Sequence, residues 1–221
     1  MWMVLGSSIG WPAMTTFTIA FTAAFAAAFV WAEVRESPSS RLLKMMASTG
    51  FIAIALSVGG LSNTYGRIVL VALVFSWAGD LLLTYTSRPA FLGGLVTFLL
   101  GHVTYSIAFG VVGLNAAAAA VAAIAMTIIG FFAWRWLGPH VGDMIGPVVA
   151  YLVVITVMVV TAVAAFGAGA TTLIPIGAIL FYASDIAVAG NRFVAPGVVN
   201  RMWGLPLYYL AQVLLASTAG G

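Results

Sequence analysis

The sequence contains no cysteine, and only 6% of its 221 residues are charged. Without cysteine the chain cannot form disulfides, Cys-ligated zinc sites or thiolate nucleophiles. A soluble domain carries roughly 25% charged residues, whereas here 63% of the residues are hydrophobic and the mean hydropathy is +1.16. This composition argues against an ordinary soluble domain and predicts a polytopic membrane protein.

The sequence also lacks clustered basic residues and the common hydrolase motifs. The net charge is +3, but the Lys and Arg residues are scattered singly, so we expect no nucleic-acid partner. Neither a GxSxG nucleophile motif nor an HExxH zinc motif occurs. The first residues, MWMVLGSSIGW, have no basic region and no obvious small-residue cleavage site, so we expect no cleaved signal peptide.

Long apolar segments fill the chain instead. A membrane-spanning helix needs about 20 apolar residues, and eight segments of this kind cover residues 12–32, 44–62, 67–86, 90–112, 115–135, 146–166, 171–190 and 202–219. The connections are too short to fold alone. The sequence therefore predicts an all-α, polytopic transmembrane bundle of eight helices, forming one transmembrane domain over residues 1–221.

The positive charges predict an orientation in the membrane. Arg67 lies at an even-numbered connection, whereas the other basic residues lie at odd-numbered ones: Arg35, Arg41, Lys44, Arg88, Arg135, Arg192 and Arg201. Cytoplasmic loops are enriched in Lys and Arg. We therefore expect cytoplasmic odd-numbered connections, both termini outside the cytoplasm, and a multi-pass protein of a bacterial inner or plasma membrane.

Two aspartates interrupt apolar runs of similar sequence: Asp80 in FSWAGDLLLTY and Asp185 in LFYASDIAVAG. A carboxylate at the centre of a membrane helix costs about 2.5–3.5 kcal/mol, so it predicts a functional site. The alternative is a structural carboxylate that a neighbouring helix caps or a Lys or Arg neutralises. Asp80 precedes Arg88 by eight residues and Asp185 precedes Arg192 by seven. The two carboxylates are therefore expected at one depth, facing each other across the bundle.

Each aspartate is followed, one helix later, by a polar–aromatic pair. GHVTYSIAF places His102 and Tyr105 on one helix face, because residues three apart are neighbours. LYYLAQVLLA places Tyr208 or Tyr209 near Gln212 in the same way. This repetition suggests two four-helix halves in parallel, with all five side chains as candidates for binding a substrate.

Four further polar residues are candidates for the same site. Lys44 opens the second segment and is a snorkelling anchor, a phosphate contact or the partner of an aspartate. Tyr151 and Tyr182 either line the site or pack in the core with paired hydroxyls. Ser184, next to Asp185, either lines the site or bonds a carbonyl of its own helix.

These residues allow two kinds of chemistry. Asp80, Asp185 and His102 would hold zinc only if all three converged, and we expect neither a metal nor another cofactor. Without a metal, a carboxylate pair acts as acid and base: one carboxyl donates a proton, while the other, ionised, activates water or stabilises a cation. A labile bond just below the head group of an amphiphile would suit carboxylates at this depth.

Five stretches, SWAGDLLL, FLLGHVTY, AYLVVITVM, GAILFYASDIAVA and YYLAQVLL, together resemble the YhhN-like lysoplasmalogenase family of eight-helix membrane proteins. Lys44 also stands where the family tends to have a lysine, although Met45 replaces the usual following proline. The resemblance implies hydrolysis of the vinyl ether of lysoplasmalogen, yielding a fatty aldehyde and glycerophosphoethanolamine or glycerophosphocholine. The family's two aspartates correspond to Asp80 and Asp185. Its helix-four and last-helix motifs correspond to His102, Tyr105, Tyr208, Tyr209 and Gln212.

Two other functions fit part of the pattern. Paired intramembrane carboxylates and internal repeats also occur in proton-coupled carriers of small molecules or lipids. A non-enzymatic membrane scaffold would tolerate leucine at both Asp80 and Asp185. The expected partners are a lysophospholipid substrate and the lipid bilayer, and the sequence carries no signal for an oligomeric state.

Overall fold

The structure, a computed structural model, describes residues 10–221. The expectation about a signal peptide concerns a stretch whose first nine residues lie outside the described part. The described chain forms eight α-helices: α1 (Gly10–Val34), α2 (Ser40–Ser57), α3 (Thr64–Leu82), α4 (Arg88–Val112), α5 (Ala116–Leu137), α6 (Ile145–Gly167), α7 (Leu173–Ala189) and α8 (Val198–Ser217). Short 3₁₀ turns follow α5 and α8, and a π-helical turn at Gly190–Val194 extends α7. The predicted eight-helix, all-α architecture is confirmed.

Side-chain caps set where three of the helices begin. The side chain of Asn63 accepts a hydrogen bond from the Gly66 amide at 2.7 Å at the start of α3. Ser87 caps α4 and Asn115 caps α5 in the same way, at 3.3 Å and 3.0 Å. Each cap satisfies one of the amides that a first helical turn leaves without a backbone partner.

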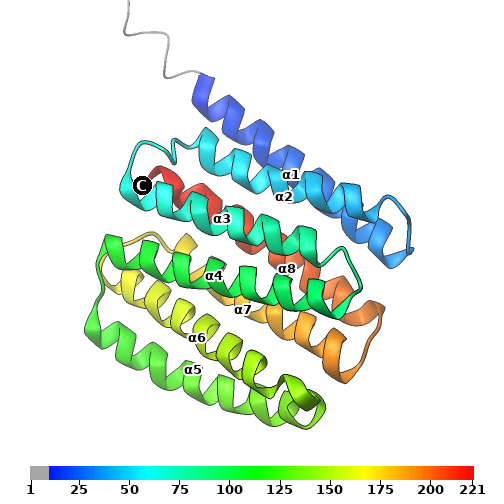
Figure 1. Ribbon diagram of the computed structural model, residues 1–221. Coiled ribbons are helices and arrows are strands. Elements are labelled where there is room, and N and C mark those ends of the chain that lie inside the picture. The colour runs from blue at the N-terminus through cyan, green and yellow to red at the C-terminus, as the bar shows by residue number, and fades with distance from the viewer. Residues whose placement is uncertain (1–9) are drawn as a thin grey trace, which may run out of the picture.

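The helices pack side by side, and each helix runs opposite to the one before it in the chain (Figure 1). Seven of them form a ring of neighbours in the order α1, α2, α3, α4, α6, α7, α8, and α8 closes the ring by packing on α1. Helix α8 also contacts α2 and α3, whereas α5 lies outside the ring against α6. Helices α3 and α7, which carry the two aspartates, run in the same direction (Figure 1).

The packing repeats between α1–α4 and α5–α8. Helix α3 packs on α4 as α7 packs on α8, α1 packs on α2 as α5 packs on α6, and α2 packs on α3 as α6 packs on α7. The halves also meet in a repeated way, because α4 packs on α6 as α8 packs on α2. The contacts therefore follow the two-half arrangement that the repeated motifs suggested.

Six helices, α1 and α3–α7, are long and apolar enough to cross a membrane. The two remaining helices, α2 and α8, lie inside the same bundle but carry more polar residues, including Lys44 and Ser48 on α2 and Tyr208 and Gln212 on α8. These side chains belong to the candidate site described below. The chain is therefore an integral, multi-pass helical protein whose two least apolar helices supply polar groups to its interior.

Glycines allow α3 and α4 to pack against each other. A Cβ atom at Gly79 of α3 would lie 2.6 Å from the Phe98 ring of α4, and one at Gly94 of α4 would lie 2.7 Å from Leu83. Close approach of this kind is typical of membrane helices, where packing rather than hydrophobic burial drives association.

We expect Gly79→Ala to destabilise the protein by about 1–3 kcal/mol, the usual range for overpacking. Phe98 is 7% exposed and its ring contacts Phe181 and Tyr208, so it has little room to move away. The matched control is Gly110→Ala in α4, because a Cβ there meets nothing within 4 Å. Thermal unfolding in detergent measures both variants, and equal midpoints would contradict the close α3–α4 contact.

Candidate active site

Asp80 lies in the interior of the bundle with its carboxylate fully engaged. Its Oδ1 is 3.2 Å from Nζ of Lys44, and its Oδ2 accepts hydrogen bonds from Ser48 Oγ and from the Tyr208 hydroxyl, both at 2.6 Å. The Asp80 side chain is 3% exposed and that of Lys44 11%. A buried carboxylate remains ionised when a cation and hydrogen-bond donors replace its lost hydration. Lys44, Ser48 and Tyr208 thus take the place of water around the Asp80 carboxylate.

Asp185 has a different and less complete set of partners. Its Oδ2 accepts a hydrogen bond from the Tyr151 hydroxyl at 2.8 Å and lies 3.1 Å from Nε2 of His102. His102 Nε2 is also 2.9 Å from the Tyr151 hydroxyl, and its Nδ1 is 3.1 Å from Sδ of Met158. Within residues 10–221, Oδ1 of Asp185 has no hydrogen-bond partner, and the side chain is 16% exposed. Asp185 thus keeps one oxygen available.

The partners of the two aspartates follow the repeat of the helices. Asp80 on α3 is bound by Ser48 of α2, 32 residues earlier, and by α8 of the other half. Asp185 on α7 is bound by Tyr151 of α6, 34 residues earlier, and by His102 on α4 of the other half. Each carboxylate is therefore held by its own half and by the last helix of the opposite half.

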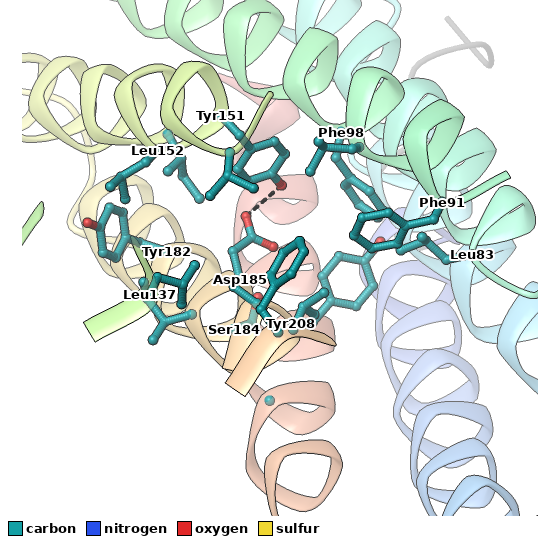
Figure 2. A pocket seen from close by; sticks show the side chains of 18 of the residues that line it. Leu83, Phe91, Phe98, Leu137, Tyr151, Leu152, Tyr182, Ser184, Asp185 and Tyr208 are labelled. Carbon is teal, nitrogen blue, oxygen red and sulfur yellow. Dashed lines mark hydrogen bonds between the residues drawn. The ribbon is translucent and has the colours of Figure 1, made fainter. Parts of the chain in front are cut away.

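Both carboxylates line a single cavity of about 120 Å³. In Figure 2 the Asp185 carboxyl points toward the Tyr151 hydroxyl, with the rings of Tyr208 and Phe98 on the opposite side of the space. Most of the wall is apolar, with contributions from Phe91, Leu95, Phe98, Leu137, Leu152, Ile155 and Phe193. Such a cavity suits an alkyl chain and places two acids beside it.

The nine other sequence candidates divide into two groups. Lys44, Tyr151, Tyr182, Ser184 and Tyr208 line the cavity together with the aspartates. Ser184 additionally donates to the carbonyl of Phe181 in its own helix at 2.7 Å, so both interpretations of this residue hold. Of the three interpretations of Lys44, the ion pair with Asp80 supports the partner of an aspartate, and the other two stay predictions.

His102, Tyr105, Tyr209 and Gln212 do not line the cavity, so their contact with a substrate stays a prediction. The Tyr105 hydroxyl donates to Gln212 at 2.8 Å, and Gln212 donates to the Tyr208 hydroxyl at 3.2 Å, which in turn donates to Asp80. The Tyr209 hydroxyl lies 3.4 Å from Ser48 Oγ. Tyr105, Tyr209 and Gln212 contact groups that hold Asp80, whereas His102 contacts Asp185 itself.

The YhhN family model matches residues 39–219 of the chain, which include every candidate residue above. The chain belongs to the YhhN family. The match leaves out residues 1–38, which include α1, and the last two residues, so the part that builds the site is the part that the family shares.

Several proteins that are similar to this chain are named as enzymes. A lysoplasmalogenase TMEM86A of Bos taurus is 30% identical over 160 residues, which cover 68% of this chain and 64% of the bovine protein. A lysoplasmalogenase of Mycobacterium bovis is 32% identical over 183 residues, covering 76% and 67% of the two chains. The human lysoplasmalogenase TMEM86B is 28% identical over 179 residues, covering 81% and 73%. The matched region thus spans about two thirds of the length of these relatives. No solved structure matches the chain.

Ser48 is a site residue of this YhhN-family chain that the sequence reasoning missed. It donates to Asp80 at 2.6 Å and is fully buried. The sequence did contain a sign of this role, because Ser48 follows Lys44 by one helical turn and therefore lies on the same face of the helix. Serine in an apolar helix most often bonds its own backbone, which is why the signal is weak.

The acidic and histidine side chains of the site do not form a metal triad. His102 contacts Asp185, whereas Asp80 is bound by Lys44. Across residues 10–221, no three His, Asp or Glu side chains lie close enough together to hold a metal ion. Asp80 and Asp185 nevertheless line the same largely apolar cavity.

Proposed function

We propose that the protein hydrolyses the vinyl ether bond of lysoplasmalogen, or of a closely related lysolipid, to a fatty aldehyde and a glycerophospho-alcohol. The observation that carries the proposal is the pair of carboxylates, one fully engaged and one with an available oxygen, on the wall of one largely apolar cavity. The names of the bovine, mycobacterial and human relatives support the same reaction.

Asp185 acts as the proton donor in this proposal. Its Oδ1 has no partner among the described residues, while Oδ2 is held by Tyr151 and His102, so the carboxyl is oriented with one oxygen available to a substrate. It protonates the alkene carbon that is not bonded to oxygen. The electrons of the double bond form the new C–H bond, and an oxocarbenium ion remains.

Asp80 stabilises that cation in its ionised form. Lys44, Ser48 and Tyr208 fix its two oxygens before any substrate arrives, so little reorganisation is needed when positive charge develops. Preorganised charge of this kind is most effective in a cavity that excludes bulk water.

Water then completes the reaction. It adds to the carbon bonded to the ether oxygen, and its released proton returns to the Asp185 carboxylate. As the bond between the hemiacetal carbon and the glycerol oxygen breaks, Asp185 passes its proton to the leaving oxygen and takes up the hydroxyl proton of the hemiacetal. The products are the aldehyde and the alcohol, and both aspartates recover their starting protonation states.

The direct test is aldehyde release by the purified protein. Wild-type protein in detergent or liposomes is expected to release fatty aldehyde from 1-alkenyl lysophospholipid, measured by an aldehyde-coupled assay. The matched saturated 1-alkyl lysophospholipid should yield none, because it has no double bond to protonate. No aldehyde release from active, folded protein would contradict the proposal. Substrate-dependent proton flux without cleavage would support the carrier instead.

A further inference from the structure

A second, larger cavity opens at the end of the bundle where the odd-numbered connections lie. It has a volume of about 630 Å³, and we call it the vestibule. Its wall comes from the ends of α1, α2, α3, α7 and α8, and it includes Glu33, Glu36, Ser37, Ser40, Arg41, Lys44, Thr84, Thr86, Asn191, Asn200 and Arg201. Charged and hydrogen-bonding side chains dominate this wall, in contrast to the wall of the inner cavity.

The vestibule adjoins the cavity of the two aspartates. Lys44, Leu83, Val188, Gly204 and Leu205 line both spaces. The ammonium group of Lys44 also pairs with Asp80 at 3.2 Å, so it stands between the polar vestibule and the carboxylates. A molecule with a polar head and an apolar tail could occupy both spaces at once.

The vestibule holds one cation and one anion that are not neutralised within the protein. Arg201 pairs with Glu33 at 3.4 Å, and Lys44 pairs with Asp80. Among residues 10–221, Arg41 and Glu36 form no ion pair, and the guanidinium of Arg41 instead lies 5.8 Å from the centre of the Tyr85 ring. The wall therefore offers a free guanidinium and a free carboxylate.

We propose that the vestibule binds a zwitterionic phosphodiester head group, with Arg41 on the phosphate and Glu36 on the terminal ammonium. This inference rests on the proposed hydrolysis and assigns the head-group site of the same substrate. The planar guanidinium matches the geometry of phosphate oxygens, and both side chains are exposed at the vestibule, where a head group can reach them. The glycerol unit then passes Lys44, which brings the ether bond to Asp80 and Asp185.

The test compares three 1-alkenyl substrates that share one alkyl chain: the glycerophosphoethanolamine, the glycerophosphate without an ammonium, and the glycerol without a phosphate. We expect Arg41→Gln to lower kcat/KM for both phosphate-bearing substrates about tenfold relative to the alkenylglycerol, the usual effect of one charge-assisted contact. Glu36→Gln should lower kcat/KM for the ethanolamine substrate about threefold relative to the glycerophosphate, since an exposed ion pair contributes less.

The matched control is Arg35→Gln. Arg35 lies at the same end of the bundle, where its guanidinium is 4.6 Å from the Trp31 ring, but it does not line the vestibule. It should leave all substrate ratios at the wild-type values. Equal loss in Arg35→Gln and Arg41→Gln would show general attraction of lipids to a basic surface and would overturn the assignment.

The outcomes separate this inference from the proposed reaction. If wild-type protein cleaves none of the three substrates, the proposed hydrolysis itself fails. If it cleaves all three and the ratios are unchanged by Arg41→Gln and Glu36→Gln, the reaction stands and the head-group site is wrong. Adding free glycerophosphoethanolamine as a competitor distinguishes binding of the head group alone, which the vestibule predicts, from recognition of the whole lipid only.

Discussion

Replacing Asp185 with Asn is expected to reduce the rate of aldehyde release by about 10²–10⁴-fold, the range for loss of a positioned general acid. The amide has nearly the same shape and retains hydrogen-bonding groups near Tyr151 and His102. It cannot donate a proton to carbon, so kcat should fall while the fold persists. The measurement is kcat for a 1-alkenyl lysophospholipid, alongside the thermal midpoint of the same preparation.

Asp143→Asn is the matched control for this substitution. Asp143 pairs with Arg88 at the surface, where its side chain is 70% exposed, and it does not line the cavity. It should keep wild-type kcat and nearly wild-type stability. Substantial activity in folded Asp185→Asn would remove the proton donor from the proposed mechanism, whatever the behaviour of Asp80.

Replacing Lys44 with Met is expected to destabilise the protein by about 3–5 kcal/mol, because it leaves Asp80 as an uncompensated buried charge. Asp80 would keep Ser48 and Tyr208 as donors, but it would lose the only cation paired with it among the described residues. Activity should fall as well, since Lys44 would no longer hold Oδ1 of Asp80 in position. Chemical or thermal unfolding in detergent measures the change in stability.

The double variant Lys44→Met with Asp80→Asn separates the two effects. Removing both charges should recover most of the lost stability, because no unpaired ion remains, whereas activity should stay low. Arg88→Met is the control, as the Arg88–Asp143 pair is exposed and should contribute about 0–1 kcal/mol. Equal stability of Lys44→Met and the wild type would show that Asp80 does not depend on this cation.

The site also explains why two helices are difficult to recognise as spans from hydropathy alone. Helices α2 and α8 provide Lys44, Ser48 and Tyr208 to Asp80, and Gln212 and Tyr209 behind it. Every polar side chain that the site requires lowers the hydropathy of the helix that supplies it. Neighbouring helices satisfy these groups, which makes their burial tolerable.

The sequence by itself determined the features that depend on local composition. Sparse charge and long apolar runs predicted a helical membrane protein, and the two aspartates stood out because a carboxylate is costly in an apolar helix. The predicted segments 67–86, 90–112 and 115–135 begin within three residues of α3, α4 and α5. Side-chain caps at Asn63, Ser87 and Asn115 set these helix starts, and a cap acts on amides only three residues away. Each of these features depends only on residues within one helix or one turn.

Only the tertiary structure decided which groups meet. In the sequence His102 follows Asp80 and Tyr208 follows Asp185, but in the bundle the partners are exchanged. Tyr208 donates a hydrogen bond to Asp80, 128 residues away, and His102 contacts Asp185, 83 residues away. The packing of α4 on α6 and of α8 on α2 creates this exchange. Helix periodicity specifies the face of a side chain but not the helix opposite it, so the two different environments of the aspartates arise from packing.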